Sequence, residues 1–412
     1  MKLPIYMDYN ATTPVDPRVF DEMKPWFCEH FGNAASRSHV FGWRAEKAVA
    51  ESRETIANLL GAAPAEIVFT SGATESDNLA IKGICEMYAP DGGAHIITSQ
   101  TEHKAVLDTC KYLETKGVEV TYLKPDVDGR VSPEQVSAEI RENTVLVTLM
   151  LANNETGTLH PIAEIGKVVR EYRARFHTNL FFHTDATQGI GKVAVDVGEM
   201  GVDLLSLSGH KIYGPKGVGA LYVRRRDPRV RLAIQTHGGG HERNMRSGTL
   251  NTPAIVGFAK ACALIGEEMD DNVDKLRHLR DRLEQGILKS VDYVKRNGHT
   301  TERMCNTANL SFAYIEGESL MLKLRDIAVS SGSACTSASL EPSFVLRSMD
   351  VPDVLAHSSL RFSLGRYNDE AEIDFVIEKA ATAVRELRGL SPLYDMAMRD
   401  GTAAETAWAQ AD

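Results

Sequence analysis

Seven short runs rich in β-branched and apolar residues, separated by segments of helical periodicity, constrain the fold of this chain more than any other feature. The runs are EIVFT, HIITS, VEVTYL, VLVTLML, LFFHTD, DLLSLS and GALYV. Near-continuous apolar strands are typical of sheets buried on both faces, so we expect an α/β fold with a mainly parallel, seven-stranded sheet covered by helices. In such folds ligands bind beyond the carboxyl ends of the strands, which directs attention to the residues after each run.

The sequence changes character after about residue 263, where charged helical sequence such as EEMDDNVDKLRHLRDRLEQGI replaces most strand runs. With 412 residues, 43% of them hydrophobic, the chain has enough apolar material for two packed lobes. We therefore expect a large domain over residues 17–263. Residues 1–16 and 264–412 are expected to form a smaller α+β domain.

Composition narrows the class of protein further. The six cysteines are scattered without a CxxC pair, which argues against a zinc site or a disulfide framework and favours free thiols in a reducing compartment. No run of about 20 apolar residues is present, and the N-terminal sequence does not resemble a signal peptide. A cytoplasmic protein without membrane contact is expected, and the net charge of -10 argues against nonspecific nucleic-acid binding.

Two of the expected strands are followed by candidate ligand groups. After EIVFT, the backbone N–H groups of Gly72, Ala73 and Thr74 would point toward an anion at the start of a helix. After HIITS, His103 lies where a helix begins, and Asn154 follows the strand VLVTLML. Each signal is weak alone, because a glycine turn or a histidine can simply cap a helix.

The next two strand ends make the set more specific. LFFHTDATQG places Asp185 and Gln188 after an apolar run, where a carboxylate needs a cationic partner or a structural cap. DLLSLSGHK places Ser208, His210 and Lys211 at the following strand end, where desolvation favours the amine form of a lysine. Pyridoxal 5'-phosphate (PLP) needs this combination of a phosphate anchor, a carboxylate for the pyridine nitrogen and a lysine for the aldehyde.

Two further residues are candidates for substrate chemistry. Cys335 lies in the small, polar segment VSSGSACTSASLEP, which has little to bury and should leave the thiol accessible, so we interpret it as a nucleophile. Arg361 alternates with apolar residues in SSLRFSLGR and suits a two-pronged grip on an α-carboxylate. Arg366, close by, could instead be the arginine that forms a salt bridge.

The motifs DYNATTP, FGNAASRSH, FTSGATESDN, TEHKAVL, NNETG, DATQ, SLSGHKIYGPKG, GGGHERNMRSGTLNTP, EGESL, SSGSACTSASLEPS and AHSSLRFSLGR span nearly the whole chain. In them the chain resembles the NifS/IscS branch of the cysteine desulfurases, which are class V aminotransferases of fold-type I, and it is most similar to the housekeeping IscS group. The resemblance implies a homodimer that uses PLP to convert L-cysteine to L-alanine, with the sulfur held as a persulfide on Cys335. It implies no resident metal, although Cys335 could transiently contact an iron–sulfur cluster.

The resemblance also assigns roles to residues. Lys211 would bond the cofactor aldehyde, Asp185 would face the pyridine nitrogen, and His103 would stack over the ring and carry protons. Arg361, with Asn33 and Asn154, would hold the substrate. The remaining cofactor contacts would be Asn154 and Gln188 at the ring oxygen and Ala73, Thr74, Ser208 and His210 at the phosphate, with Thr249 supplied by a second subunit. Ala34 stands where the family usually has proline, which makes the loop that carries Asn33 less rigid.

The end of the chain suggests a partner surface. Apolar residues from Ile373 to Leu387 recur at helical spacing and predict a packing helix. Beyond it, the tail of residues 391–412 carries Leu393, Tyr394, Met396 and Met398 outside any core pattern, which fits either a loosely folded end or a docking segment. In housekeeping desulfurases the matching tail, which begins with the same Ser-Pro-Leu, docks an iron–sulfur scaffold protein, so that scaffold and other sulfur acceptors, including those for tRNA thiolation, are the expected partners.

Three other interpretations remain open at this stage. A class V aminotransferase would keep PLP but leave Cys335 without a role. A selenocysteine lyase would use the same site on a related substrate. A non-catalytic scaffold for sulfur-carrier assembly is the third, although the lysine, aspartate and cysteine of the motifs argue against it.

Overall fold

A seven-stranded sheet with the order β2-β8-β7-β6-β5-β3-β4 forms the centre of the larger lobe. The computed structural model describes residues 2–176, 178–331, 341–403 and 407–408. Strand β8 runs antiparallel to both of its neighbours, and the other pairs are parallel, which confirms the predicted mainly parallel sheet. The strands are β2 (Ile67–Thr70), β3 (His95–Ser99), β4 (Glu119–Leu123), β5 (Thr144–Thr148), β6 (Phe181–Asp185), β7 (Leu204–Ser208) and β8 (Gly219–Val223).

Helices cover both faces of this sheet because side chains of alternate strand residues point to opposite faces. In β6, for example, Phe182 packs into one apolar core and its neighbour Phe181 into the other. The helices of the lobe are α1 (Pro17–Met23), α2 (Pro25–Cys28), α3 (Val40–Leu59), α4 (Ala73–Tyr88), α5 (Lys104–Glu114), α6 (Pro133–Glu139) and α7 (Ile162–Phe176), with 3-10 turns η1 (Pro64–Glu66), η2 (Gly209–Lys211) and η3 (Glu242–Asn244). Helices α3 and α7 belong to the first core, and α4 and α5 belong to the second.

The smaller lobe is built on a three-stranded antiparallel sheet of order β12-β10-β9 and a parallel pair, β1 with β11. Its strands are β1 (Ile5–Tyr6), β9 (Val294–Asn297), β10 (Thr307–Phe312), β11 (Ile327–Ala328) and β12 (Ser359–Ser363). Its helices are α9 (Gly317–Lys323), α10 (Phe344–Ser348), α11 (Asp353–His357), α12 (Glu370–Arg388) and α13 (Pro392–Arg399). The predicted packing helix is α12, which the Asp369 side chain caps by accepting a hydrogen bond from the Glu372 N–H.

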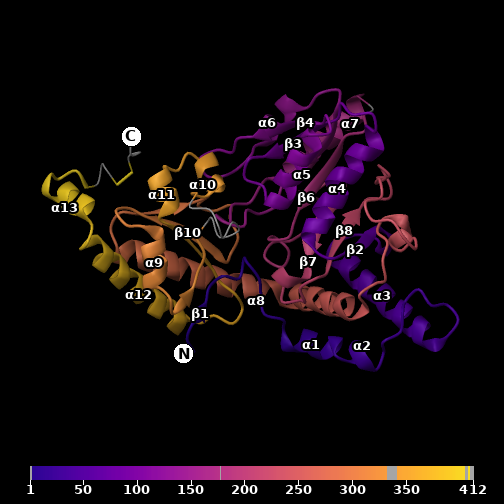
Figure 1. Cartoon of the computed structure of the whole chain (residues 1–412), viewed down its shortest axis with the longest axis horizontal. Coiled ribbons are helices and arrows are strands. Elements are labelled where there is room, and N and C mark those ends of the chain that lie inside the picture. Colours follow the sequence, from indigo (N-terminus) through magenta and orange to yellow (C-terminus); the bar gives the residue numbers. More distant parts are fainter. Residues whose placement is uncertain (1, 177, 332–340, 404–406, 409–412) are drawn as a thin grey trace.

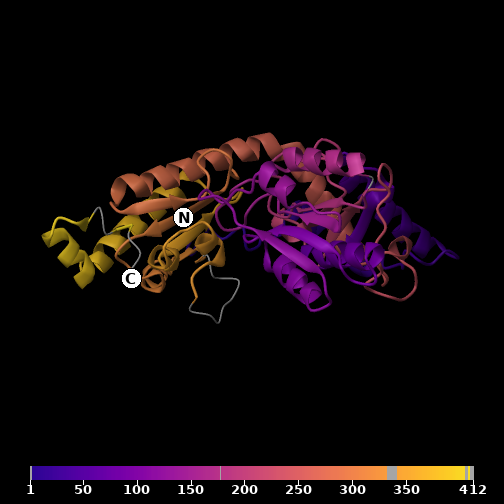
Figure 2. The same cartoon turned by 90° about the horizontal axis from the view of Figure 1, so that it is seen from above.

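One helix, α8 (Thr252–Ser290), runs through both lobes (Figures 1 and 2). Its first part, up to Ile265, packs into the large-lobe core, and its second part, from Leu276, packs into the small-lobe core. The boundary expected at residue 263 therefore falls inside a continuous helix. The N-terminal residues Ile5 and Met7 pack into the small-lobe core.

The free cysteines of the described residues are buried at Cys85, Cys110, Cys262 and Cys305, and Cys28 is exposed at the end of α2. Cys335 and most of the predicted cysteine loop, about residues 329–341, lie outside the described residues. Within the part of the chain that the structure describes, no helix has the length and apolar character required to cross a bilayer.

Candidate active site

A cavity of about 570 Å³ lies at the carboxyl edge of the large sheet, and residues from both lobes line it. It brings together ten of the predicted site residues: Ala73, Thr74, His103, Asn154, Asp185, Gln188, Ser208, His210, Lys211 and Arg361. Asn33 and Thr249 are exposed and do not line this cavity. Cys335 cannot be placed because it lies outside the described residues.

The anion-binding end of the cavity is the start of α4. Gly72 precedes the helix with a φ of 151°, a conformation that favours glycine, and no side chain caps the helix at this position. The helix dipole and the first backbone N–H groups therefore face the cavity, where Ser208 and His210 also lie. Burial lowers the pKa of His210 to about 4, so its imidazole is neutral.

Asp185 ends strand β6, and its Oδ1 accepts a hydrogen bond of 2.9 Å from the Thr187 N–H. Two other acids, Asp77 and Glu102, lie behind it and are fully buried. Burial raises the pKa of both groups well above the usual range, and the charge of Asp185 raises them further. The protonated forms of Asp77 and Glu102 are thereby favoured, and Asp185 is the member of the group that lines the cavity.

His103 caps helix α5. Its Nδ1 accepts a hydrogen bond of 3.1 Å from the Ala105 N–H, and burial lowers the pKa of the imidazole. Because the ring is neutral and Nδ1 is an acceptor, the ring proton is on Nε2. His103 thus presents an N–H donor on its free edge.

Lys211, in the turn η2 directly after β7, reaches the N-terminal segment of the chain. Its Nζ donates to the carbonyl oxygens of Asn10 at 2.5 Å and Ala11 at 2.8 Å. The Gln188 amide nitrogen also donates to the Asn10 carbonyl, at 2.9 Å. The other end of that amide, Gln188 Oε1, is buried and has no hydrogen-bond partner among the described residues.

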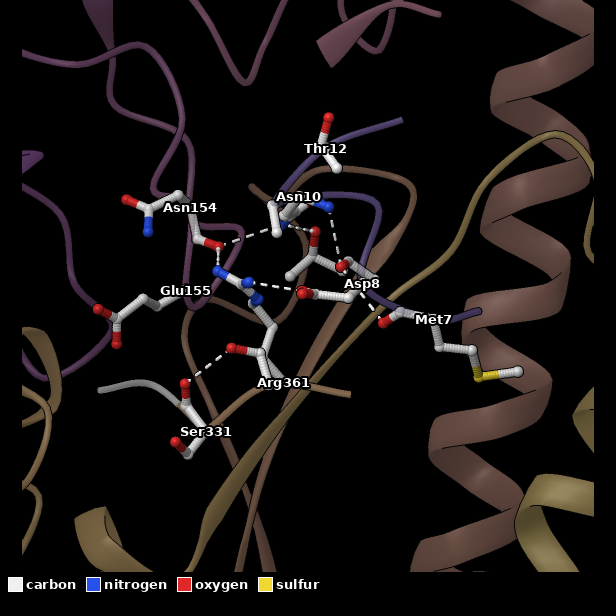
Figure 3. Close-up of polar contacts among 12 residues, drawn as sticks. Met7, Asp8, Asn10, Thr12, Asn154, Glu155, Ser331 and Arg361 are labelled. Atoms are coloured by element: carbon white, nitrogen blue, oxygen red, sulfur yellow. Dashed lines mark hydrogen bonds and ion pairs between the residues drawn. The ribbon is translucent and has the colours of Figure 1, made fainter. Parts of the chain in front are cut away.

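Arg361, on β12, lines the cavity from the small-lobe side. Figure 3 shows its polar contacts. Its Nη1 donates to the Asn154 carbonyl at 2.8 Å, and its Nη2 donates to the Asp8 carboxylate at 2.7 Å. Arg366, the alternative arginine, instead pairs with Asp16 at 2.9 Å and does not line this cavity. The geometry therefore leaves Arg361 as the arginine that can reach a ligand.

Residues 8–12 are the part of the site that sequence reasoning missed. Besides the contacts of Asp8 and the Asn10 carbonyl, the Asn10 amide donates to the Asn154 carbonyl at 3.1 Å. The Thr12 hydroxyl lies 3.1 Å from Nδ1 of His210. One signal was available: DYNATTP places a polar cluster directly after an apolar pair, but no strand or helix pattern ties it to the large sheet.

Comparison with known proteins identifies the family. The family model for aminotransferase class-V matches residues 5–376. A cysteine desulfurase IscS from Anaeromyxobacter sp. (strain K) is 56% identical over 401 residues, which cover 97% of each chain. A solved NifS-like protein matches with a TM-score of 0.85 and 37% identity, and the match covers 93% of this chain and 100% of that one. The structure of SspA in complex with cysteine matches with a TM-score of 0.77 and 40% identity, and the match covers 89% of this chain and 100% of that one.

These structural matches assign the fold to the fold-type I class of PLP-dependent enzymes. Both the sequence and the structural matches run along almost the whole chain. The chain belongs to the class-V aminotransferase family and, within it, to the cysteine desulfurases of the IscS type.

Proposed function

We propose that this chain is a PLP-dependent cysteine desulfurase that converts L-cysteine to L-alanine and holds the released sulfur as a persulfide on Cys335. One observation carries the proposal: a lysine, a carboxylate, a helix N-terminus and an arginine from four separate segments line one cavity. The similarity to IscS cysteine desulfurases extends over almost the whole chain, which supports the same reaction for this protein.

The cavity fits PLP in size and in chemistry. Its volume of about 570 Å³ lies within the range of small-molecule sites. The α4 N-terminus with Ala73, Thr74, Ser208 and His210 would hold the phosphate, and Asp185 would accept a hydrogen bond from the protonated pyridine nitrogen. Gln188 Oε1, which has no partner among the residues that the structure describes, needs a donor, which the ring hydroxyl would supply, with Asn154 also lining the cavity.

The protein's own groups would bind and orient the substrate. When bound, PLP supplies an electrophilic carbon for the substrate amine and an electron sink for charge that develops at the α-carbon. Lys211 would hold the cofactor through its aldehyde, because its Nζ is an amine that lines the cavity beside Asp185 and Gln188. Arg361 fixes the α-carboxylate, and His103 moves a proton through Nε2 near the substrate amine and thiol.

The sulfur step balances without an added oxidant. The Cys335 thiolate attacks the substrate sulfur, an S–S bond forms, and the C–S bond breaks with its electron pair left on the substrate carbon. A proton then reaches that carbon and gives alanine. The protein thiol and cysteine together become a protein persulfide and alanine.

The decisive experiment measures alanine and sulfide from L-cysteine with a reductant present and no oxo acid. Equal yields support the proposal, and turnover that requires an oxo acid would make the protein an aminotransferase instead. Cys335→Ala should retain PLP and lose sustained alanine formation, and a wild-type rate in that variant would refute the nucleophile assignment. L-selenocysteine in the same assay tests the lyase alternative.

A homodimer is part of the proposal. Phe31, Phe41 and Trp43 are 65%, 48% and 54% exposed, and the rings of Phe31 and Phe41 stack on each other with centroids 5.5 Å apart. Exposed aromatic groups of this kind suit burial against a second copy of the chain. Thr249 is exposed and does not line the cavity of its own subunit, and it would reach the phosphate site of the partner subunit. Asn33, beside these aromatic residues, is proposed to contact substrate only in the assembled enzyme.

Mixed dimers test the shared site. Thr249→Val should weaken PLP retention, and mixing it with inactive Lys211→Ala subunits places both lesions in one site and neither in the other. Activity should rise after subunit exchange. A mixture whose activity does not rise after subunit exchange would exclude a contribution of Thr249 across the interface.

The C-terminal helix α13 is proposed to dock an iron–sulfur scaffold protein. Leu393, Met396 and Met398 are 70%, 59% and 50% exposed, whereas the Tyr394 ring packs beside Tyr314 with centroids 5.5 Å apart. Deleting residues 393–412 should leave alanine formation nearly unchanged and sharply reduce sulfur transfer to a scaffold. Met396→Ser and Met398→Ser should reproduce the loss of transfer, with Tyr394→Ala as a control for folding of the helix.

Equal loss of turnover and transfer in these variants would make the helix structural. Sulfur delivery for tRNA thiolation and a cytoplasmic location complete the proposal. Loss of tRNA thiolation in a deletion strain and recovery of the protein in the cytoplasmic fraction would test them.

A further inference from the structure

The guanidinium of Arg361 already has a carboxylate partner, which none of the proposed roles uses. Asp8 lies 2.7 Å from Nη2 of Arg361, and its side chain is 22% exposed while that of Arg361 is 5% exposed. Asp8 also lines the cavity. The pair, whose contact is drawn in Figure 3, therefore lines the space that a substrate would occupy.

Two of the five N–H groups of Arg361 are committed. Nη1 binds the Asn154 carbonyl and Nη2 binds Asp8, whereas Nε is buried without a hydrogen-bond partner among the described residues. A planar guanidinium held at two points has a fixed orientation, and the second N–H group of each Nη atom remains for a further acceptor. Arg361 is thus positioned for one carboxylate.

The charge near Arg361 comes mainly from Asp8. Glu155 is also near, but burial raises its pKa to about 7, so it carries only part of a charge at neutral pH. A substrate carboxylate that joins Arg361 must share a cation that Asp8 already neutralises. With the substrate carboxylate bound, two carboxylates share one guanidinium, so an additional anionic group on the substrate meets a net negative charge beside Arg361.

A second aspartate–arginine pair of the same two segments shows what a structural pair looks like. Asp16 and Arg366 are 2.9 Å apart and are 3% and 9% exposed. Arg366 lies over the Tyr213 ring, with its guanidinium carbon 4.0 Å from the centroid, and neither member lines the large cavity. Asp16 also begins helix α1 by accepting a hydrogen bond from Arg18. Asp8 differs in facing the ligand space.

We propose that Asp8 is a specificity-determining residue: it orients Arg361 for a single α-carboxylate, and its charge excludes amino acids that carry a second acidic group. This inference rests on the proposed role of Arg361 in substrate binding. It limits the substrate class to amino acids with uncharged side chains, such as cysteine.

The test compares L-asparagine with L-aspartate, whose side chains match in shape and differ in charge. Dissociation constants are measured by calorimetry on the PLP-loaded enzyme. The wild type should bind L-aspartate at least tenfold more weakly. In Asp8→Asn the amide oxygen still accepts a hydrogen bond from Nη2 of Arg361, so the affinity for L-asparagine should persist. The ratio of the L-aspartate dissociation constant to the L-asparagine dissociation constant should fall by about tenfold, because one nearby charge has been removed from a partly buried site.

Asp16→Asn is the matched control, because it makes the same substitution in the structural pair and should leave the ratio at the wild-type value. A wild-type enzyme that binds both ligands equally would overturn the proposal even if Asp8→Asn did not fold. A folded Asp8→Asn with an unchanged ratio would also overturn it. If Arg361→Lys keeps wild-type affinity for L-asparagine, the substrate role of Arg361 fails, which is a different result.

Discussion

The large-lobe wall and the small-lobe wall of the cavity differ in what holds their side chains in place. His103 and Lys211 follow strands of the large sheet, and Asp185 ends one. All residues of these strands are buried, so the core itself positions the three side chains. Arg361 lies on an equally buried strand, β12, but its long side chain is held at its charged end by hydrogen bonds to Asp8 and Asn154, which come from distant segments. A lesion in the first wall should remove cofactor chemistry, whereas a lesion in the second should change ligand affinity with the cofactor retained.

Lys211→Ala should give the largest effect, with cysteine turnover reduced at least 1,000-fold because the nucleophilic amine is lost. Borohydride should fix PLP to the wild-type protein and not to the variant. Peptide mapping is needed because burial lowers the pKa of Lys192 to about 8 and Lys192 lines a small cavity that Lys211 also borders. Label at Lys192 in the wild type would contradict the assignment of Lys211.

Arg361→Lys should reduce kcat/KM for cysteine by roughly 100-fold, since a point charge cannot replace a fork that binds a carboxylate with two parallel hydrogen bonds. PLP content should stay at the wild-type level, as expected for a small-lobe lesion. Arg366→Lys is the control: it should lower the melting temperature and leave KM unchanged. Parallel loss of PLP and cysteine affinity in Arg361→Lys would erase the distinction between the two walls.

Glu155 lies between the walls, because it follows Asn154 and accepts a hydrogen bond of 2.5 Å from the Ser343 hydroxyl of the small lobe. Burial raises its pKa to about 7, so the folded chain holds this proton more tightly than the unfolded chain does. The resulting stabilisation is complete below about pH 4.3 and is lost as the pH rises through 7. Between pH 5 and pH 8, Glu155→Gln should gain roughly 2 to 3 kcal/mol relative to the wild type.

Denaturant unfolding at several pH values measures this gain. Ser343→Ala serves as a companion variant: the Ser343 hydrogen bond lowers the pKa of Glu155, so its removal should shift the pH-dependent loss to higher pH. A constant stability difference between Glu155→Gln and the wild type at all pH values would show that Glu155 does not titrate in this range.

The smallest effect is expected at Lys124, which joins the lobes through Asp350 at 2.7 Å on the surface. The two side chains are 53% and 62% exposed, so solvent screens the pair. Lys124→Ala should change the free energy of unfolding by less than about 0.5 kcal/mol and leave KM unchanged. A larger loss would mean that surface contacts between the lobes hold the small-lobe wall.

The residues of the large-lobe wall could be predicted from the sequence, whereas only part of the small-lobe wall could. The strand ends with His103, Asp185 and Lys211 could be predicted because strand periodicity is local and parallel strands share an edge. Asp8 and Asn10 could not be predicted in this way, because their contacts are with residues far away in the chain. Asp8, for example, binds Arg361. Arg361 was predicted as the substrate arginine from its alternation with apolar residues, but nothing in the sequence indicated the Asp16 partner that holds Arg366 away from the large cavity.

The domain division shows the same limit. Charge and periodicity marked a change near residue 263, but they gave no sign that one helix would continue across it. A helix that packs into two cores keeps its 3.6-residue hydrophobic period throughout, so the sequence pattern shows no interruption at the domain boundary. Cys335 and its loop remain a prediction from sequence and family resemblance.

Helix α8 has a mechanical consequence. At 1.5 Å per residue its 39 residues make a rod of about 58 Å, and each lobe grips a different part of it. Hinge motion between the lobes would have to bend this helix or separate it from the apolar core of one lobe. We therefore expect the lobes to move as one stiff body during turnover, so that two spin labels on opposite lobes keep a constant separation with and without cysteine.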